Sequence, residues 1–226
     1  NIFSLSLFFV IRMIFLITFG GNVPLTTDYQ IRYKILAENI INGNEYGIGA
    51  DMAYPPIYPL FIALNHVLFD SHIISIKIMQ ILFDLGICLI IYFMTLKIMN
   101  RRVALIAMTL WGIYPFAIWQ TNIIGTESLF TLLLILFIYS LTITYTKRSK
   151  LFAGISGFFL GLAMLTRPLL TYFPILIPII FWKKIMNIKL AMFLFSILLV
   201  GYYITVSPWV LLNYHNYGEF KIGAIL

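Results

Sequence analysis

Residues 121–136 read TNIIGTESLFTLLLIL, and this stretch decides the fold class. A carboxylate, Glu127, stands at the head of an apolar run that continues to about residue 145. Such a run predicts a membrane-spanning helix, because about 20 residues at 1.5 Å each cross the hydrocarbon core. An ionised side chain beside hydrocarbon is expensive. Glu127 therefore either caps the start of the helix or serves a functional site.

The rest of the chain has the same apolar character. Of its 226 residues, 62% are hydrophobic and only 10% are charged, and the mean hydropathy is +0.98. Soluble domains carry about 25% charged residues. The composition therefore predicts an all-α fold, a polytopic transmembrane helical bundle. The single cysteine, Cys88, excludes a disulfide within the chain.

The net charge of +7 comes from basic residues gathered between the apolar runs. Nine of the 15 Lys and Arg fall in three clusters without any acid: Lys97, Arg101, Arg102; Lys147, Arg148, Lys150; and Lys183, Lys184, Lys189. Short basic clusters of this kind lie on the cytoplasmic side of membrane proteins. The pattern indicates membrane topology and argues against a nucleic-acid partner, which needs a continuous basic surface.

With the clusters inside, the apolar runs predict about seven spans, and we treat 1–226 as a single transmembrane domain. The expected spans are 2–19, 72–96, 103–119, 127–145, 151–166, 169–182 and 188–206. Residues 56–70 are too short to cross and are expected to form an interfacial or re-entrant helix. Residues 20–70 then form one long extracytoplasmic loop that carries interfacial helices. A short outer turn is expected near Asn122, with that side chain accessible.

The long loop carries its own helix signals. Thr27 and Gln30 fit a capping box around Asp28, which lies where the helix dipole favours an anion. Asn42-Gly43 is a typical helix end. Three prolines in YPPIYPLF, residues 54–61, exclude regular helix before Pro59.

Five stretches of the chain also match one family in order and interval. They are DYQIRYKILA (28–37), PPIYPLFIA (55–63), TESLFTLLLILF (126–137), GLAMLTRP (161–168) and PWVLLNYHNYGEF (208–220). The chain resembles the integral-membrane GT-C glycosyltransferases of the protein mannosyltransferase and aminoarabinose transferase type. It departs from them at Leu212, where the last motif usually has Arg, and at Tyr29, where many relatives have a second acid. The resemblance also implies that the chain is the N-terminal part of a longer enzyme.

The resemblance implies transfer of a sugar from a polyprenyl-phosphate donor to a lipid, glycan or protein acceptor. The active site would face outward from the plasma membrane, among membrane lipids. Asp28 matches the acid of the first loop and is expected to activate the acceptor, or to bind a divalent metal ion. Glu127 matches the acid that opens the fourth span and is expected to complete the acidic site.

The remaining candidate residues concern the donor and the substrate pocket. Arg167 in the TRP turn is expected to contact the donor phosphate, although an arginine there could equally extend to the interface. Arg12, buried in the first span, is a second candidate for holding the lipid carrier. Tyr33 and Tyr58 are expected to line the substrate pocket. Asp84 is expected to form a structural hydrogen bond or an ion pair.

Two alternatives from other classes stay open on the sequence. A secondary transporter or lipid flippase would place Arg12 and Asp84 along a pathway. A catalytically silent membrane scaffold would account for the departures at Tyr29 and Leu212.

Overall fold

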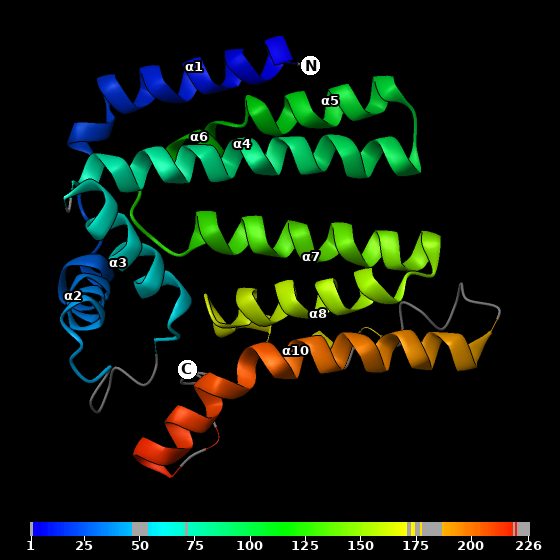
Figure 1. Cartoon of the computed structure of the whole chain (residues 1–226). Helices are drawn as coiled ribbons and strands as arrows, with labels where there is room; N and C mark the ends of the chain where they lie inside the picture. The colour runs from blue at the N-terminus through cyan, green and yellow to red at the C-terminus, as the bar shows by residue number, and fades with distance from the viewer. Residues whose placement is uncertain are drawn as a thin grey trace. The chain divides into compact units, whose positions relative to one another are not determined.

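The structure, a computed structural model, describes residues 2–46, 54–70, 72–170, 173–174, 177, 187–218 and 220 (Figure 1). All regular structure in these ranges is helical. The chain divides into two compact units, which are described separately. The first unit comprises Asn1–Tyr46 and Tyr58–Leu132, and the second comprises Gly47–Ile57 and Leu133–Leu226.

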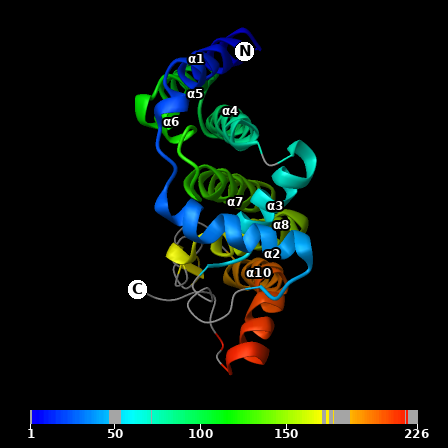
Figure 2. The same cartoon turned by 90° about the vertical axis from the view of Figure 1, so that its left-hand side faces the viewer.

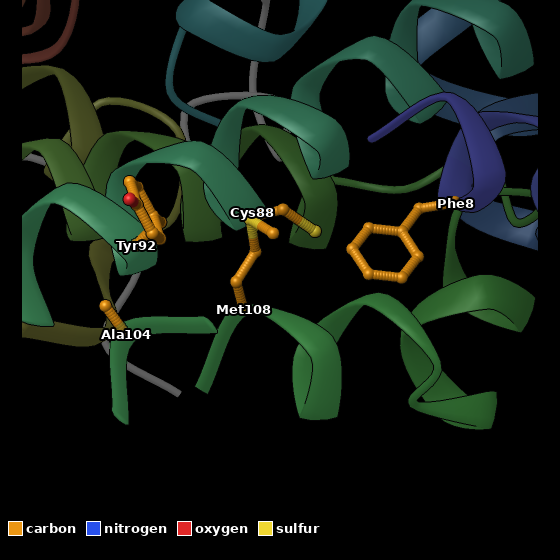
Figure 3. Close-up of a cluster of buried hydrophobic side chains, with 5 residues drawn as sticks. All are labelled: Phe8, Cys88, Tyr92, Ala104 and Met108. Carbon is orange, nitrogen blue, oxygen red and sulfur yellow. The ribbon is translucent and has the colours of Figure 1, made fainter. Parts of the chain in front are cut away.

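The core of the first unit forms where three helices pack side by side: α1 (Ile2–Thr18), α4 (Ile73–Ile98) and α5 (Arg101–Gly112) (Figures 1 and 2). Figure 3 shows the buried side chains that join them: Phe8, Cys88, Tyr92, Ala104 and Met108. Gly112 lets the Phe8 ring approach, because a Cβ at that position would lie 2.5 Å from the ring. The predicted helical bundle is therefore confirmed for this part of the chain.

The loop between α1 and α4 forms short elements. A 3-10 turn, η1 (Gly20–Asn22), is followed by a π-helical turn, η2 (Tyr29–Tyr33), and by α2 (Lys34–Asn42). Gly43 ends α2 with a φ of +68°, as the Asn42-Gly43 pair predicted. The next helix, α3 (Ile57–Phe69), has 13 residues and lies where a short helix was expected at 56–70; its interfacial or re-entrant position stays a prediction.

The expected third span at 103–119 is wrong as a continuous helix. α5 ends at Gly112, and α6 (Pro115–Gln120) is a separate short helix. Pro115 has no N–H to continue the ladder, and it holds Tyr114 in an extended conformation with ψ of 115°. The expectation of an accessible Asn122 is also wrong, because that side chain is fully buried. A Cβ on Gly20 would lie 2.7 Å from Asn122 Oδ1. Position 20 therefore needs a glycine, because the Asn122 side chain approaches its backbone closely.

The second unit is built on close packing between α8 (Lys150–Met164) and α10 (Ile188–Tyr217). Glycines on both helices let the backbones approach. A Cβ on Gly157 would lie 1.9 Å from the carbonyl oxygen of Leu198, and one on Gly201 would lie 2.4 Å from that of Gly154. Small residues at helix contacts are typical of membrane proteins, where hydrophobic burial does not drive helix association.

α10 is longer than the span expected at 188–206, because Pro208 lies inside the helix instead of ending it. Proline removes the hydrogen bond to the residue four positions earlier, Ile204, and bends the helix. Figure 1 shows the bend of α10 toward its red end. The Ser207 hydroxyl donates to the exposed Ile204 carbonyl at 3.4 Å, so the freed acceptor keeps a partner.

Three of the described helices are long and apolar enough to cross a membrane: Ile73–Ile98, α7 (Glu127–Lys147) and Ile188–Asn216. Shorter apolar helices are Ser4–Thr18, Ile57–Phe69 and Lys150–Met164. These helices make the chain a membrane protein, while the count of seven spans stays a prediction. The expected sixth span, 169–182, lies largely outside the described residues.

Candidate functional site

The two segments that carry the candidate acids are joined by a side chain of the loop. The Thr26 hydroxyl donates a hydrogen bond of 2.8 Å to the carbonyl oxygen of Ile124. The Thr26 hydroxyl oxygen also accepts a hydrogen bond of 3.2 Å from the backbone N–H of Tyr29, so Thr26, and not Thr27, caps the start of the loop helix. Thr26 precedes Asp28 by two residues, and Ile124 precedes Glu127 by three. The bond between Thr26 and Ile124 therefore holds the two acidic segments against each other.

Asp28 itself lies at the surface. Its side chain is 57% exposed and lies 3.4 Å from Arg32 Nη1, one helical turn further along. An exposed pair of this kind stabilises little. The Asp28 carboxylate is thus accessible to a substrate.

Tyr58 forms the buried centre of an aromatic cluster. It is 0% exposed, and the Tyr33 ring meets it edge-on with centroids 4.9 Å apart. Burial raises the pKa of Tyr58 well above its ordinary value, and the charges of Tyr33, Glu127 and Tyr29 raise it further. The structure thus brings Tyr33 and Tyr58 into contact, while a shared pocket with Glu127 stays a prediction.

Gln80, which the sequence analysis did not single out, connects this cluster to the loop before Glu127. Its side-chain carbonyl accepts from the Tyr58 hydroxyl at 3.3 Å. Its amide donates to the carbonyl oxygens of Thr121, at 3.0 Å, and Ile123, at 2.7 Å. Gln80 is fully buried. The signal that could have found it is the row Lys77, Gln80, Asp84, polar groups at helical spacing inside an apolar span.

A cavity of about 290 Å³ opens beside Glu127 in the first unit. Its lining includes the aromatic residues Trp111, Tyr114 and Phe116 and the polar residues Asp84, Gln120, Glu127, Ser128 and Thr131. Hydroxyl, amide and carboxylate groups beside aromatic rings suit a ligand that has several hydroxyl groups and an apolar ring face.

The Arg12 side chain is buried in the protein interior. Its guanidinium is 0% exposed and forms an ion pair with Asp84, and Nη1 donates to the carbonyl oxygen of Gly112 at 2.9 Å. The Trp111 indole donates to the other Asp84 oxygen at 2.9 Å. Asp84 thus has the ion pair expected for it. These partners occupy the guanidinium, and a contact between Arg12 and the donor phosphate stays a prediction.

Arg167 belongs to the second unit. It follows the end of α8, where its backbone N–H donates to Ala163 at 2.9 Å, and its side chain is half-buried. The N–H of Ile57 donates to the carbonyl oxygen of Leu165 at 3.1 Å. This bond places the proline segment that precedes Tyr58 in the sequence against the turn that carries Arg167.

The part of the chain that the structure describes contains no cluster of typical metal-ligand side chains. No three His, Cys, Asp or Glu side chains lie together there. Asp28 and Glu127 could each supply carboxylate oxygens, which hard divalent cations prefer. Metal binding at Asp28 stays a prediction.

Comparison with known proteins identifies the family. The family model described as dolichyl-phosphate-mannose-protein mannosyltransferase matches residues 53–212, more than half of the chain. The match includes Tyr58, Gln80, Glu127 and Arg167, and it begins after Asp28. No curated protein and no solved structure matches. The chain therefore belongs to the dolichyl-phosphate-mannose-protein mannosyltransferase family and is a membrane glycosyltransferase of the mannosyltransferase-like kind.

Proposed function

We propose that the protein transfers a sugar from a polyprenyl-phosphate-linked donor to an acceptor at the outer face of the plasma membrane. The observation that supports this most is the bond from Thr26 to Ile124, 2.8 Å long. It joins the Asp28 segment to the Glu127 segment across almost 100 residues of sequence. Two carboxylates held at the end of an apolar bundle are suited to proton transfer beside a lipid-linked substrate.

In the proposed reaction, an acceptor hydroxyl attacks the anomeric carbon of the donor sugar. Asp28 takes the proton of that hydroxyl, and the bond from the anomeric carbon to the phosphate oxygen breaks. The lipid phosphate leaves with the bonding electron pair. Arg167 is proposed to stabilise this phosphate, because a guanidinium keeps its charge and matches phosphate oxygens in pairs.

The cavity beside Glu127 is the proposed place of the sugar. Glu127, Ser128 and Thr131 lie on adjacent turns at the start of α7 and line it together with Trp111. Tyr33 and Tyr58 are proposed to line the substrate pocket. The transporter alternative is less well supported, because the Arg12 guanidinium is fully buried and bonded to Asp84 and to the carbonyl oxygen of Gly112.

The full-length enzyme, reconstituted with a polyprenyl-phosphate sugar, tests the proposal. Asp28→Asn and Glu127→Gln are each expected to lower kcat by about 10²–10⁴-fold, the usual range for loss of a general base. Glu38→Gln is the matched control, since Glu38 is exposed in the same loop and pairs with Lys34 at 3.8 Å. Full activity of Asp28→Asn would remove Asp28 as the base.

Arg167→Ala tests the donor contact separately. If Arg167 binds the lipid phosphate, the KM for the donor should rise by more than the KM for the acceptor. Arg148→Ala is a suitable control, because that exposed arginine lies in a predicted cytoplasmic turn. Unchanged kinetic constants for Arg167→Ala would show that another group holds the phosphate.

A further inference from the structure

A second buried cation, Lys77, lies on α4 about one turn before Gln80. Lys77 is 4% exposed, and its ammonium donates a hydrogen bond of 2.6 Å to the carbonyl oxygen of Gly20. A lysine ammonium carries three donors. The structure gives Lys77 no acidic partner among the described residues, so its charge is not balanced by the protein there.

Lys77 lines a groove of about 530 Å³ between the end of α1 and the start of α4. The lining contains no acid. Apart from Lys77 it is formed by apolar side chains and two glycines, among them Leu16, Ile17, Gly21, Val23, Ile74 and Ile78. An apolar groove with one cation at its wall is complementary to a lipid, which has an apolar chain and an anionic phosphate.

The position of Lys77 along α4 agrees with a lipid as the occupant of this groove. It is the fifth residue of α4, about 6 Å from the helix start, and α1 ends at Thr18 beside it. Because α4 is long and apolar enough to cross a membrane, its first residues are expected near the level at which lipid phosphates lie. An unbalanced cation deeper in hydrocarbon would be costly, whereas one near the headgroups can reach a lipid phosphate.

We propose that this groove binds an anionic phospholipid of the outer leaflet. The phosphate oxygens accept hydrogen bonds from Lys77, and one acyl chain occupies the apolar groove. The sugar donor is a weaker candidate, because its phosphate is bonded to the reacting carbon and must lie at the acidic site. The groove and the cavity beside Glu127 share no lining residue. The proposal does not depend on sugar transfer.

Native mass spectrometry of the full-length protein, purified with phosphatidylglycerol and phosphatidylcholine in equal amounts, measures the binding directly. The wild type is expected to retain phosphatidylglycerol in preference. Lys77→Met should lower its occupancy about tenfold, as expected for loss of a hydrogen bond from a charged donor. Lys97→Met is the matched control on the same helix, since Lys97 is exposed and lies outside the groove. Equal retention by wild type and Lys77→Met would overturn the proposal.

Gly21→Leu provides a second test that leaves Lys77 in place. Gly21 lines the groove, and a Cβ there meets nothing within 4 Å, so the new side chain should enter the groove without disturbing the fold. Phosphatidylglycerol occupancy should fall, and unchanged occupancy would contradict a lipid chain in the groove. This variant decides the question if Lys77→Met does not fold. Displacement of phosphatidylglycerol by equimolar polyprenyl phosphate would instead assign the groove to the donor and overturn the phospholipid assignment.

Discussion

Arg12 and Asp84 form a buried ion pair in which Arg12 Nε donates to Asp84 Oδ2 at 2.7 Å. Their side chains are 0% and 5% exposed. The pair joins α1 to α4, and the bonds to Gly112 and Trp111 extend it to α5. Burial of two ions is unfavourable on its own, but removal of one partner leaves a buried charge without compensation.

Asp84→Ala is therefore expected to destabilise the first unit strongly, by about 3–5 kcal/mol. Thermal unfolding of the purified protein in detergent measures the change. Arg12→Met combined with Asp84→Leu should recover most of the loss, because no charge then remains buried. Leu82→Ala is the control on the same helix, since Leu82 is 47% exposed. If Asp84→Ala were no worse than this control, the pair would not be structural.

Gln80→Leu should impair catalysis through the position of Glu127. The substitution leaves the carbonyl oxygens of Thr121 and Ile123 and the Tyr58 hydroxyl without their buried partner, at about 1–3 kcal/mol for each unsatisfied group. We expect kcat to fall while the KM for the lipid donor changes little. Gln80→Glu keeps the acceptor for Tyr58 but loses the two donors, so activity retained by that variant would contradict the role of the loop bonds.

The sequence predicted the features that depend on local pattern. α7 begins at Glu127 as expected, α3 is short, and Asp84 has the ion pair expected of a carboxylate inside a span. Each of these follows from apolar length, helix-end chemistry or the cost of a buried charge. Such signals are contained within a single segment and do not require knowledge of its neighbours.

Features that depend on which segments meet could not be predicted. Asn122 is in a polar-looking turn, yet it is buried because Gly20 packs against it. Gln80 and Lys77 lie in one apolar run, and nothing local indicates that one faces Tyr58 while the other faces Gly20. The break between α5 and α6 had a local cause in Pro115. It was missed because the apolar run continues across it.

Gly157→Ala should separate α8 from α10. A Cβ at Gly157 would lie 1.9 Å from the Leu198 carbonyl oxygen and 2.8 Å from the Tyr202 nitrogen, and both are backbone atoms. Overpacking of this kind typically destabilises by about 1–3 kcal/mol. Gly154→Ala is the matched control on the same helix, because its nearest contact is at an ordinary 3.7 Å. Equal thermal stabilities of the two variants would contradict the close packing.

His66 should make stability depend on pH. The side chain is 6% exposed and Nε2 has no hydrogen-bond partner within the described part of the chain. Burial lowers its pKa below the ordinary value of 6.5, Glu38 raises it and Lys34 lowers it. As the pH falls, His66 in the unfolded chain therefore binds a proton at a higher pH than His66 in the folded chain does. Stability is fully present above pH 6.5 and is lost as the pH falls from there toward the lower pKa of the folded state, by at most about 1.4 kcal/mol per pH unit.

His66→Gln should flatten this part of the pH profile, measured as the thermal midpoint from pH 7.5 to 5. His72→Gln is the control, because His72 is exposed. A profile that keeps its slope without His66 would assign the effect to another group.

The topology can be tested with single cysteines, because the native thiol of Cys88 is 0% exposed and should not react. Asn44→Cys lies in the loop before α3, and Asn100→Cys lies in the turn between α4 and α5. Both positions are exposed. The positive-inside rule places Asn100, beside Arg101 and Arg102, in the cytoplasm and Asn44 outside. A membrane-impermeant maleimide should therefore label intact cells at residue 44, and should label residue 100 only after permeabilisation. The reverse pattern would invert the bundle and move Asp28 and Glu127 to the cytoplasmic face.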